Sequence, residues 1–345
     1  MFFDKILIFN NLNNSYIYLI LSILIFLPIL TNIINIQCKK FNLLDIPNGR
    51  KTHKYPTPIS GGIIFLISIT AVFTIIQILF ETNLSFYSNI LLISSVFFLV
   101  GIFDDKKNPN TILKIIIILI PLLIITIFFE NLLISELRFK YLYQNSISLK
   151  FFAIPFTMFC IFMFFNALNY ADGKNGVCIS YVIYLIFFLS TLTNEFKEFY
   201  YLNILILLLI LFFNLKSKLF LGNNGVNLLS IYLSLTIIKT YNVDNYVIYC
   251  DEILLLMLIP GVDATRVTIQ RLYNKISPVK PDKKHLHHYI SLLVSDKFVW
   301  MVYLFLASSP IILLNYSKNF FLSILLPLII YFFVVFKISK IKSYD

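Results

Sequence analysis

Charged residues are scarce in this chain: they make up 13% of its 345 residues, while 59% are hydrophobic. Soluble domains are about a quarter charged and about half apolar, so the composition excludes an ordinary soluble globular protein. Cysteine is also rare. The four cysteines (Cys38, Cys160, Cys178 and Cys250) are scattered, mostly in or beside apolar runs, and their spacing gives neither a disulfide framework nor a CxxC site.

Acidic residues are few as well, with 17 against 28 lysines and arginines, for a formal net charge of +11. A basic balance of this size can indicate nucleic-acid binding, but here the basic residues lie in short segments between apolar runs. That is the pattern of topology signals and of loops that face anionic lipid or phosphates. We therefore expect membrane lipid, and no nucleic acid, as a partner.

Long apolar runs make up most of the sequence. A helix needs about 20 apolar residues to cross the hydrocarbon, and the first run has a weak basic start and no small-residue cleavage site, so we expect it to be retained. The predicted fold is an all-α integral membrane protein, a single transmembrane domain over 1–345 built as a polytopic bundle of about eleven transmembrane helices. The predicted spans are 16–36, 59–80, 88–103, 112–130, 149–168, 177–193, 199–215, 226–240, 246–262, 299–315 and 320–336.

Orientation follows from the lysines and arginines. With the N-terminus outside, most of the 28 basic residues fall in the loops that then face the cytoplasm. The longest of these predicted loops is 263–298. Four unusual polar clusters also fall on this side: Asp104–Asp105, Asn166 to Gly176, Gly222 to Gly225, and Asp263 to His288. Their convergence predicts one composite active site at the cytoplasmic face of the bundle.

Asp104 and Asp105 end a long apolar run, where the partial negative charge of a helix C-terminus disfavours carboxylates. Desolvating them costs several kcal/mol unless a cation offsets the charge. One interpretation is a solvated helix end neutralised by Lys106 and Lys107. The other is a divalent-metal site, since Mg²⁺ takes hard oxygen ligands beside substrate phosphates. The two aspartates alone leave both open.

The second cluster follows the apolar run 149–165. Asn166, Asn169 and Asp172 are spaced i, i+3 and i+6, so on a continuing helix they share a face, and Gly173 and Gly176 then interrupt the helix. A capped polar turn explains the glycines but not the polar stripe. We therefore favour a ligand-binding role for the stripe.

Two shorter segments have ordinary alternatives. The stretch 220–225 is either a turn and N-cap or a helix N-terminus that offers N–H groups to phosphate. Between the first two spans, Arg50, Lys51 and His53 are either topology signals or phosphate ligands. Gly61–Gly62, at the next helix start, predicts close packing or a ligand.

Three of the four histidines lie between His285 and His288, downstream of Asp263 and Arg271. Zinc is one alternative, but no second histidine group closes a tetrahedral site. A solvated surface loop is another. A phosphate-binding loop fits better, because histidine and arginine donate hydrogen bonds to phosphoryl oxygens.

Taken in order, these clusters resemble the polyprenyl-phosphate N-acetylhexosamine-1-phosphate transferases of glycosyl transferase family 4, which include the MraY and WecA enzymes. Asp45 to Gly62 is similar to the family's Pro-Asn-x-Arg-Lys-x-His and Pro-x-x-Gly-Gly signature. The Arg-Lys-x-His residues favour the WecA branch over the MraY branch. Gly101 to Asp105 resembles Gly-x-x-Asp-Asp. Asn166 to Gly176 resembles Asn-x-x-Asn-x-x-Asp-Gly-x-Asn/Asp-Gly, and His285 to His288 resembles His-x-His-His.

The resemblance implies an Mg²⁺-dependent enzyme of the bacterial inner membrane, with Mn²⁺ as the alternative ion. It implies transfer of N-acetylhexosamine 1-phosphate from a UDP-sugar, UDP-GlcNAc or a related UDP-HexNAc, to undecaprenyl phosphate. UMP is released, and synthesis of a cell-envelope glycan such as peptidoglycan or lipopolysaccharide begins. Whether the protein forms a homodimer is left open.

The resemblance also implies roles for individual residues. The implied catalytic residues are Asp104, Asp105, Asp172 and His287, and the implied metal ligands are Asp104, Asp105 and Asn223. The implied substrate-binding residues are Lys51, His53, Asn166, Asn169, Asn175, Phe220 (stacked on uracil), Arg271, His285 and His288.

The sequence departs from the family at one of these positions. The family reads Phe-Leu-Gly-Asp-x-Gly-Ser, whereas this chain has Asn223 and Val226 in place of the aspartate and the serine. Asparagine offers a carbonyl oxygen but no charge. The alternative function is therefore a catalytically impaired homologue that binds UDP-sugar or lipid phosphate. A secondary transporter is disfavoured, because the charges lie at the ends of the spans and not in their middle.

Overall fold

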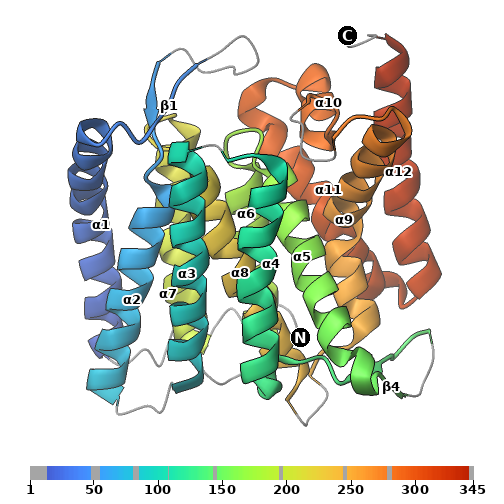
Figure 1. The fold of residues 1–345 in the computed structure, drawn as a ribbon, viewed down its shortest axis with the longest axis horizontal. Coiled ribbons are helices and arrows are strands. Elements are labelled where there is room, and N and C mark those ends of the chain that lie inside the picture. The colour runs from blue at the N-terminus through green and yellow to red at the C-terminus, as the bar shows by residue number, and fades with distance from the viewer. Residues whose placement is uncertain are drawn as a thin grey trace.

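In a computed structural model, the chain forms a bundle of roughly parallel and antiparallel helices (Figure 1). The structure describes residues 14–47, 55–80, 85–107, 109–142, 146–193, 197–243, 247–277 and 282–341. Lys51 and His53 therefore lie outside the described residues. The helices are α1 (Asn14–Lys40), α2 (Gly61–Phe80), α3 (Ser85–Lys107), α4 (Thr111–Phe128), α5 (Ala153–Ala171), α6 (Val177–Leu192), α7 (Lys197–Leu215), α8 (Gly222–Tyr241), α9 (Cys250–Tyr273), α10 (Leu286–Leu293), α11 (Val299–Ser317) and α12 (Phe320–Ile341).

Two small antiparallel strand pairs complete the fold. The strand β1 (Leu44–Asp45) pairs with β2 (Thr57–Pro58), and β3 (Glu136–Arg138) pairs with β4 (Ser146–Ser148). In Figure 1 the β1 strand and α10 lie at the same end of the bundle, and β4 lies at the opposite end.

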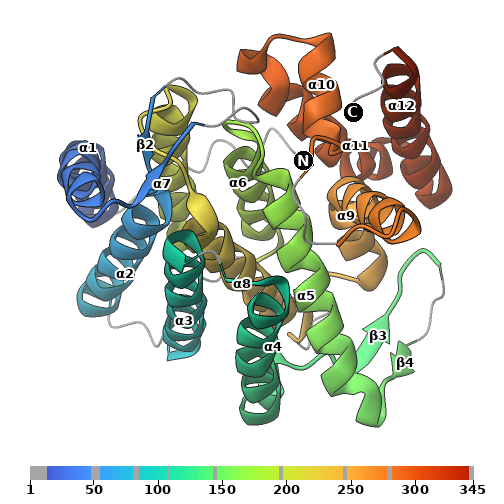
Figure 2. The ribbon, with the colours of Figure 1, turned by 45° about the horizontal axis from the view of Figure 1, so that its top comes forward.

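The all-α membrane fold is confirmed, and each of the eleven predicted spans overlaps a helix, with boundaries that differ by up to eleven residues. Among the described residues, seven helices are long and apolar enough to cross a membrane, and α4 and α6 contain shorter apolar helices. The remaining two, α8 and α9, carry more polar residues. Nearly all of α8 is buried, and it crosses behind α3 and α5 in Figure 2.

Four small hydroxyl side chains of α8 are satisfied inside the helix. Ser230, Ser234, Thr236 and Thr240 each donate a hydrogen bond to the backbone carbonyl four residues earlier, over 2.6–2.9 Å. Such bonds satisfy these four hydroxyls in an apolar surrounding, and small side chains let neighbouring helices approach closely. This explains how a helix of modest hydropathy occupies the centre of the bundle.

The segment 263–298, predicted as a loop, is partly helical. The helix α9 continues to Tyr273, and α10 forms from Leu286. The continuation is stable because Asp263 and Arg266, one helical turn apart, form an ion pair over 2.8 Å, and Tyr331 of α12 hydrogen-bonds to both. Local composition could not indicate that contact with α12.

Candidate active site

The end of α3 and the start of α8 are joined by one carboxylate. Asp105 Oδ1 accepts a hydrogen bond from the Asn223 N–H over 2.9 Å, and its Oδ2 accepts from the Asn224 N–H and side-chain amide over 3.0 and 2.7 Å. A carboxylate is stabilised at a helix N-terminus by the unpaired N–H groups and the helix dipole. These two N–H groups, which were candidates for binding phosphate, are therefore occupied by Asp105. The same contacts start α8 at Gly222, four residues before the predicted boundary.

Glycines bring the start of α8 against both neighbouring helices. A Cβ on Gly101 would lie 2.4 Å from the Asn224 Cα, and a Cβ on Gly62 would lie 2.4 Å from the Gly225 Cα. Backbone cannot be displaced as cheaply as a flexible side chain, so only glycine fits at these positions. The close-packing interpretation of Gly61–Gly62 is confirmed for Gly62. This packing holds the Asp105 carboxylate against α8.

Asp104 is neutralised by a lysine that sequence analysis gave no role. Its Oδ1 lies 2.6 Å from Lys114 Nζ on α4, and both side chains are largely buried. Lys106 and Lys107, which the solvated interpretation assigned to this purpose, are exposed. The only sequence signal for Lys114 was a single lysine inside an otherwise apolar run.

The predicted metal ligands do not fit a metal ion in this arrangement. Asp105 already accepts three hydrogen bonds, Asp104 is paired with Lys114, and Asn223 carries no charge. Among the described residues, no group of three or more His, Cys, Asp or Glu side chains is placed to hold a metal ion. Mg²⁺, with Mn²⁺ as the alternative, remains a prediction, and Asp104, Asp105 and Asn223 are not a preformed site for it.

The turn between α5 and α6 carries the second motif. The helix α5 ends at Ala171, where the Asp172 N–H bonds to the Asn169 carbonyl over 3.3 Å, and Gly176 takes a left-handed φ of 82°. The predicted helix break is therefore confirmed. The Asp172 side chain remains open to solvent, yet surrounding protein raises its pKa to about 7, aided by the negative charges of Asp105 and Asp45.

The asparagines of this motif make contacts within the protein. The Asn166 amide donates to the Phe162 carbonyl over 2.7 Å, one turn earlier in α5. Asn175 donates to the Ser217 hydroxyl over 2.9 Å, and Asn214 of α7 accepts from the Gly176 N–H over 2.7 Å. Asn175 thus ties the turn to the end of α7. The predicted substrate contacts of Asn166, Asn169 and Asn175 remain predictions.

In the histidine motif, His285 and Arg271 belong to a buried network. The His285 Nδ1 lies 3.1 Å from Asp263 Oδ2, and its Nε2 lies 3.3 Å from Arg271 Nη2. Since arginine can only donate, Nε2 accepts and the His285 proton lies on Nδ1, facing Asp263. Arg271 also donates to Asp282 over 2.9 Å. Both residues are therefore held in fixed orientations by acidic partners.

His287 connects this motif to the turn after α5. It is 1% exposed, its Nε2 has no hydrogen-bond partner among the described residues, and a Cβ on Gly173 would lie 2.0 Å from that atom. Burial lowers the pKa of His287 well below its usual value, and burial together with His285 lowers the pKa of His288 to about 4. Both rings are neutral at pH 7 and can donate or accept a proton.

The structure thus brings most of the predicted site residues to one end of the bundle. Asp105 meets the start of α8, Gly173 meets His287, and the Tyr170 ring lies 4.7 Å from the His285 ring. Phe220 is half-buried, and its backbone pairs with Pro58 and Gly61 over 2.9 Å each. Sequence reasoning assigned no role to Lys114, Tyr170 or Tyr331, because each acts through a partner on another element of the fold.

Comparison with known proteins shows which family the chain is similar to. The family model of glycosyl transferase family 4 matches residues 87–241. The undecaprenyl-phosphate alpha-N-acetylglucosaminyl 1-phosphate transferase of Thermotoga maritima is 25% identical over 295 residues, 85% of this chain and 87% of the relative. The chain is thus similar to the proteins of glycosyl transferase family 4.

Other similar proteins are transferases of two kinds. The Escherichia coli O157:H7 transferase with the same name is 26% identical, over 79% of this chain and 75% of the relative. The phospho-N-acetylmuramoyl-pentapeptide-transferase of Staphylococcus carnosus is 28% identical, over 78% of this chain and 87% of the relative. The resemblance stated from the four motifs is thereby confirmed. The apolar helices and the similarity to this family indicate a multi-pass membrane protein and a transferase.

The matched range runs from α3 to α8 and contains three of the four clusters. Asp104–Asp105, the turn from Asn166 to Gly176, and Asn223 lie within it. The histidine motif lies beyond it. Its place in the candidate site is supported by the contact between Gly173 and His287.

Proposed function

We propose that the protein transfers N-acetylhexosamine 1-phosphate from a UDP-sugar, with UDP-GlcNAc as the first candidate, to undecaprenyl phosphate and releases UMP. The relatives' names support both the sugar and the lipid acceptor. The observation that carries the proposal is the position of the turn after α5. In this turn the negative charge of Asp105 helps to raise the pKa of Asp172, and Gly173 packs on His287.

In this reaction, an oxygen of the lipid phosphate attacks the phosphorus that bears the sugar, and the bond from that phosphorus to the UMP oxygen breaks. Enzymes of phosphoryl transfer act mainly by positioning the reactants and by stabilising the spreading negative charge. With a pKa near 7, Asp172 can take the last proton from the acceptor phosphate. His287 and His288 are neutral donors for the phosphoryl oxygens.

The lipid acceptor and the charge pattern suggest the orientation. We place the N-terminus outside and the end of the bundle that carries α10 in the cytoplasm of a bacterium, at the inner membrane. The basic residues of the segments 37–58, 104–111 and 263–298 support this placement. Cysteine variants in these segments should react with an impermeant thiol reagent only after the cells are opened.

A labelling assay tests the proposed function. Purified protein is incubated with Mg²⁺, undecaprenyl phosphate and each of several radiolabelled UDP-N-acetylhexosamines. We expect a labelled, organic-extractable lipid with at least one donor, and its loss in Asp172→Ala. The absence of labelled lipid with every donor would refute the transferase.

A second candidate is a homologue that binds UDP-sugar or lipid phosphate without turnover. It is favoured by Asn223, which stands where the family has an aspartate, and by the full engagement of Asp105. It predicts saturable binding of UDP-sugar with no labelled lipid. Asn223→Asp distinguishes the candidates: activation from zero would mark a lost catalytic site, whereas an active wild-type protein rules out the second candidate.

A further inference from the structure

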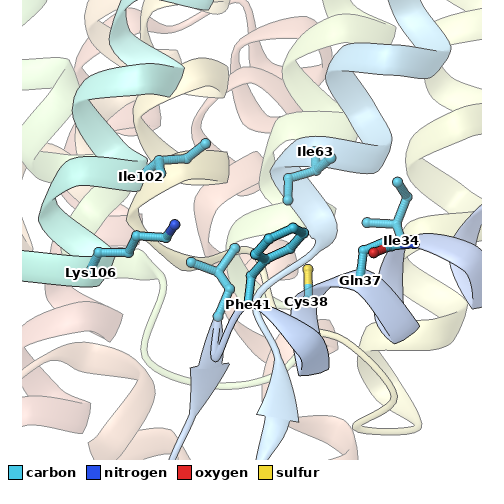
Figure 3. Close-up of a pocket in the computed structure, with 8 residues that line it drawn as sticks. Ile34, Gln37, Cys38, Phe41, Ile63, Ile102 and Lys106 are labelled. Atoms are coloured by element: carbon cyan, nitrogen blue, oxygen red, sulfur yellow. The ribbon is translucent and has the colours of Figure 1, made fainter.

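An apolar pocket lies between α1, α2 and α3, beside the candidate site. It has a volume of about 210 Å³, and its walls include Ile34 and Cys38 of α1, Ile63 of α2 and Ile102 of α3 (Figure 3). Phe41, which follows α1, covers one side and is itself 69% exposed. The volume is below the range of about 300–1,000 Å³ for sites of drug-sized molecules. It suits one segment of a hydrocarbon chain.

Two polar side chains stand at the edge of this pocket. Lys106 and Gln37 extend from opposite sides of it in Figure 3, one from α3 and one from α1. Both are exposed. Within the part of the chain that the structure describes, Lys106 has no ion pair, whereas Lys114 and Lys174 each lie within 2.7 Å of an aspartate. The pocket thus combines apolar walls with a cation that has no anionic partner.

The surroundings of the pocket are those of a membrane interface. Lys39 and Lys40 end α1 and Lys107 ends α3, at the same end of the bundle as β1. Exposed apolar side chains such as Phe41 cost free energy in water but not against lipid. Basic residues between transmembrane helices attract anionic lipid headgroups.

We propose that this pocket binds an anionic phospholipid, with one acyl chain against Ile63 and Ile102 and the phosphate at Lys106. The charge of Lys106 selects the anionic headgroup, and Gln37 can donate a hydrogen bond to its oxygens. The lipid is separate from the acceptor, which has to reach Asp172 and His287. A phospholipid differs from the acceptor in having a glycerol backbone and two acyl chains.

The bound lipid has a consequence for the site. Ile102 and Lys106 lie one turn apart on α3, and Asp105 of the same turn holds the start of α8. A chain packed on Ile102 therefore steadies the helix end that positions Asp105. On the basis of the proposed function, anionic phospholipid should increase the transfer rate without entering the reaction.

Binding is tested without activity, so its failure can be told apart from failure of the proposed function. Full-length protein in detergent is mixed with equal amounts of phosphatidylglycerol and phosphatidylcholine, and retained lipid is measured by native mass spectrometry. We expect retention of phosphatidylglycerol about fivefold above phosphatidylcholine, which corresponds to about 1 kcal/mol for one lysine near an anionic headgroup.

Single-residue variants test whether the retained phosphatidylglycerol is bound in the pocket. Ile63→Trp should fill the pocket and reduce retention of both lipids. If that variant folds poorly, Ile34→Trp fills the same pocket from α1. Lys106→Gln should remove only the preference for phosphatidylglycerol. Lys107→Gln, which removes an adjacent lysine that does not line the pocket, is the matched control and should keep the preference.

Three results would overturn the proposal. The first is full retention of phosphatidylglycerol by folded Ile63→Trp or Ile34→Trp protein. The second is an equal loss of preference in Lys106→Gln and Lys107→Gln, which would indicate a diffuse surface charge. The third is displacement of the retained lipid by one equivalent of undecaprenyl phosphate, which would assign the pocket to the acceptor.

Discussion

Tyr331, on the last helix, donates a hydrogen bond to Asp263 over 2.9 Å, although the two residues are 68 positions apart in the sequence. The same hydroxyl accepts from Arg266 Nε over 2.6 Å. Asp263 in turn faces His285 Nδ1 and the Leu286 N–H. The C-terminal helix therefore fixes the start of α10 and the orientation of the first histidine of the motif.

Removal of that hydroxyl should weaken the histidine motif. Tyr331→Phe leaves the buried Arg266 Nε–H without its partner, at a cost of about 1–3 kcal/mol. We expect a lower melting temperature in detergent and a lower kcat. Tyr316→Phe is the control, because Tyr316 is 87% exposed. An unchanged melting temperature in Tyr331→Phe would contradict the network.

The contact between α3 and α8 should not tolerate a single methyl group. Gly101→Ala places a Cβ against the Asn224 backbone and should separate α8 from Asp105, at a cost of about 1–3 kcal/mol. Gly261→Ala, where a Cβ would meet nothing within 4 Å, should stabilise the protein by about 0.5–1 kcal/mol. Melting temperatures of the two variants should therefore move in opposite directions. A shift of the same sign in both would argue against the close packing.

Much of this arrangement was predictable from local pattern. Apolar runs of membrane length predicted eleven of the twelve α-helices in the described residues, and α10 was missed. Motifs such as Gly-x-x-Asp-Asp placed the polar ends of the helices on one side. The partners of those polar groups were not predictable. The engagement of Asp105 by Asn224, of Asp104 by Lys114, and of Asp263 by Tyr331 depends on how different helices pack, and none of these pairs has a signature in the sequence.

The raised pKa of Asp172 predicts a pH-dependent stability. A carboxyl group whose pKa rises to about 7 on folding binds a proton in the folded state between pH 4 and pH 7, where the unfolded state does not. The contribution of Asp172 to the free energy of unfolding is therefore fully present below about pH 4 and is lost as the pH rises through 7. Asp172→Asn should have a higher melting temperature than the wild-type protein at pH 8 and the same melting temperature at pH 4. An equal difference at both pH values would contradict the shift.

Neutralisation of Asp104 by Lys114 predicts that the pair acts as a unit. Lys114→Met leaves a largely buried carboxylate without a cation and should destabilise the protein, whereas Lys114→Met combined with Asp104→Asn should recover part of that loss. The measurement is a double-mutant cycle in melting temperature. Additive effects of the two substitutions would show that the pair is not coupled.

The central claim is that the group moved to the lipid is a sugar phosphate. The most direct test uses a UDP-N-acetylhexosamine labelled with ³²P in its β-phosphate, together with undecaprenyl phosphate and the purified protein. The account predicts that the label enters the lipid product and that one unlabelled UMP is released for each labelled lipid. Release of the label as UDP or as inorganic phosphate, with none in the lipid, would contradict it.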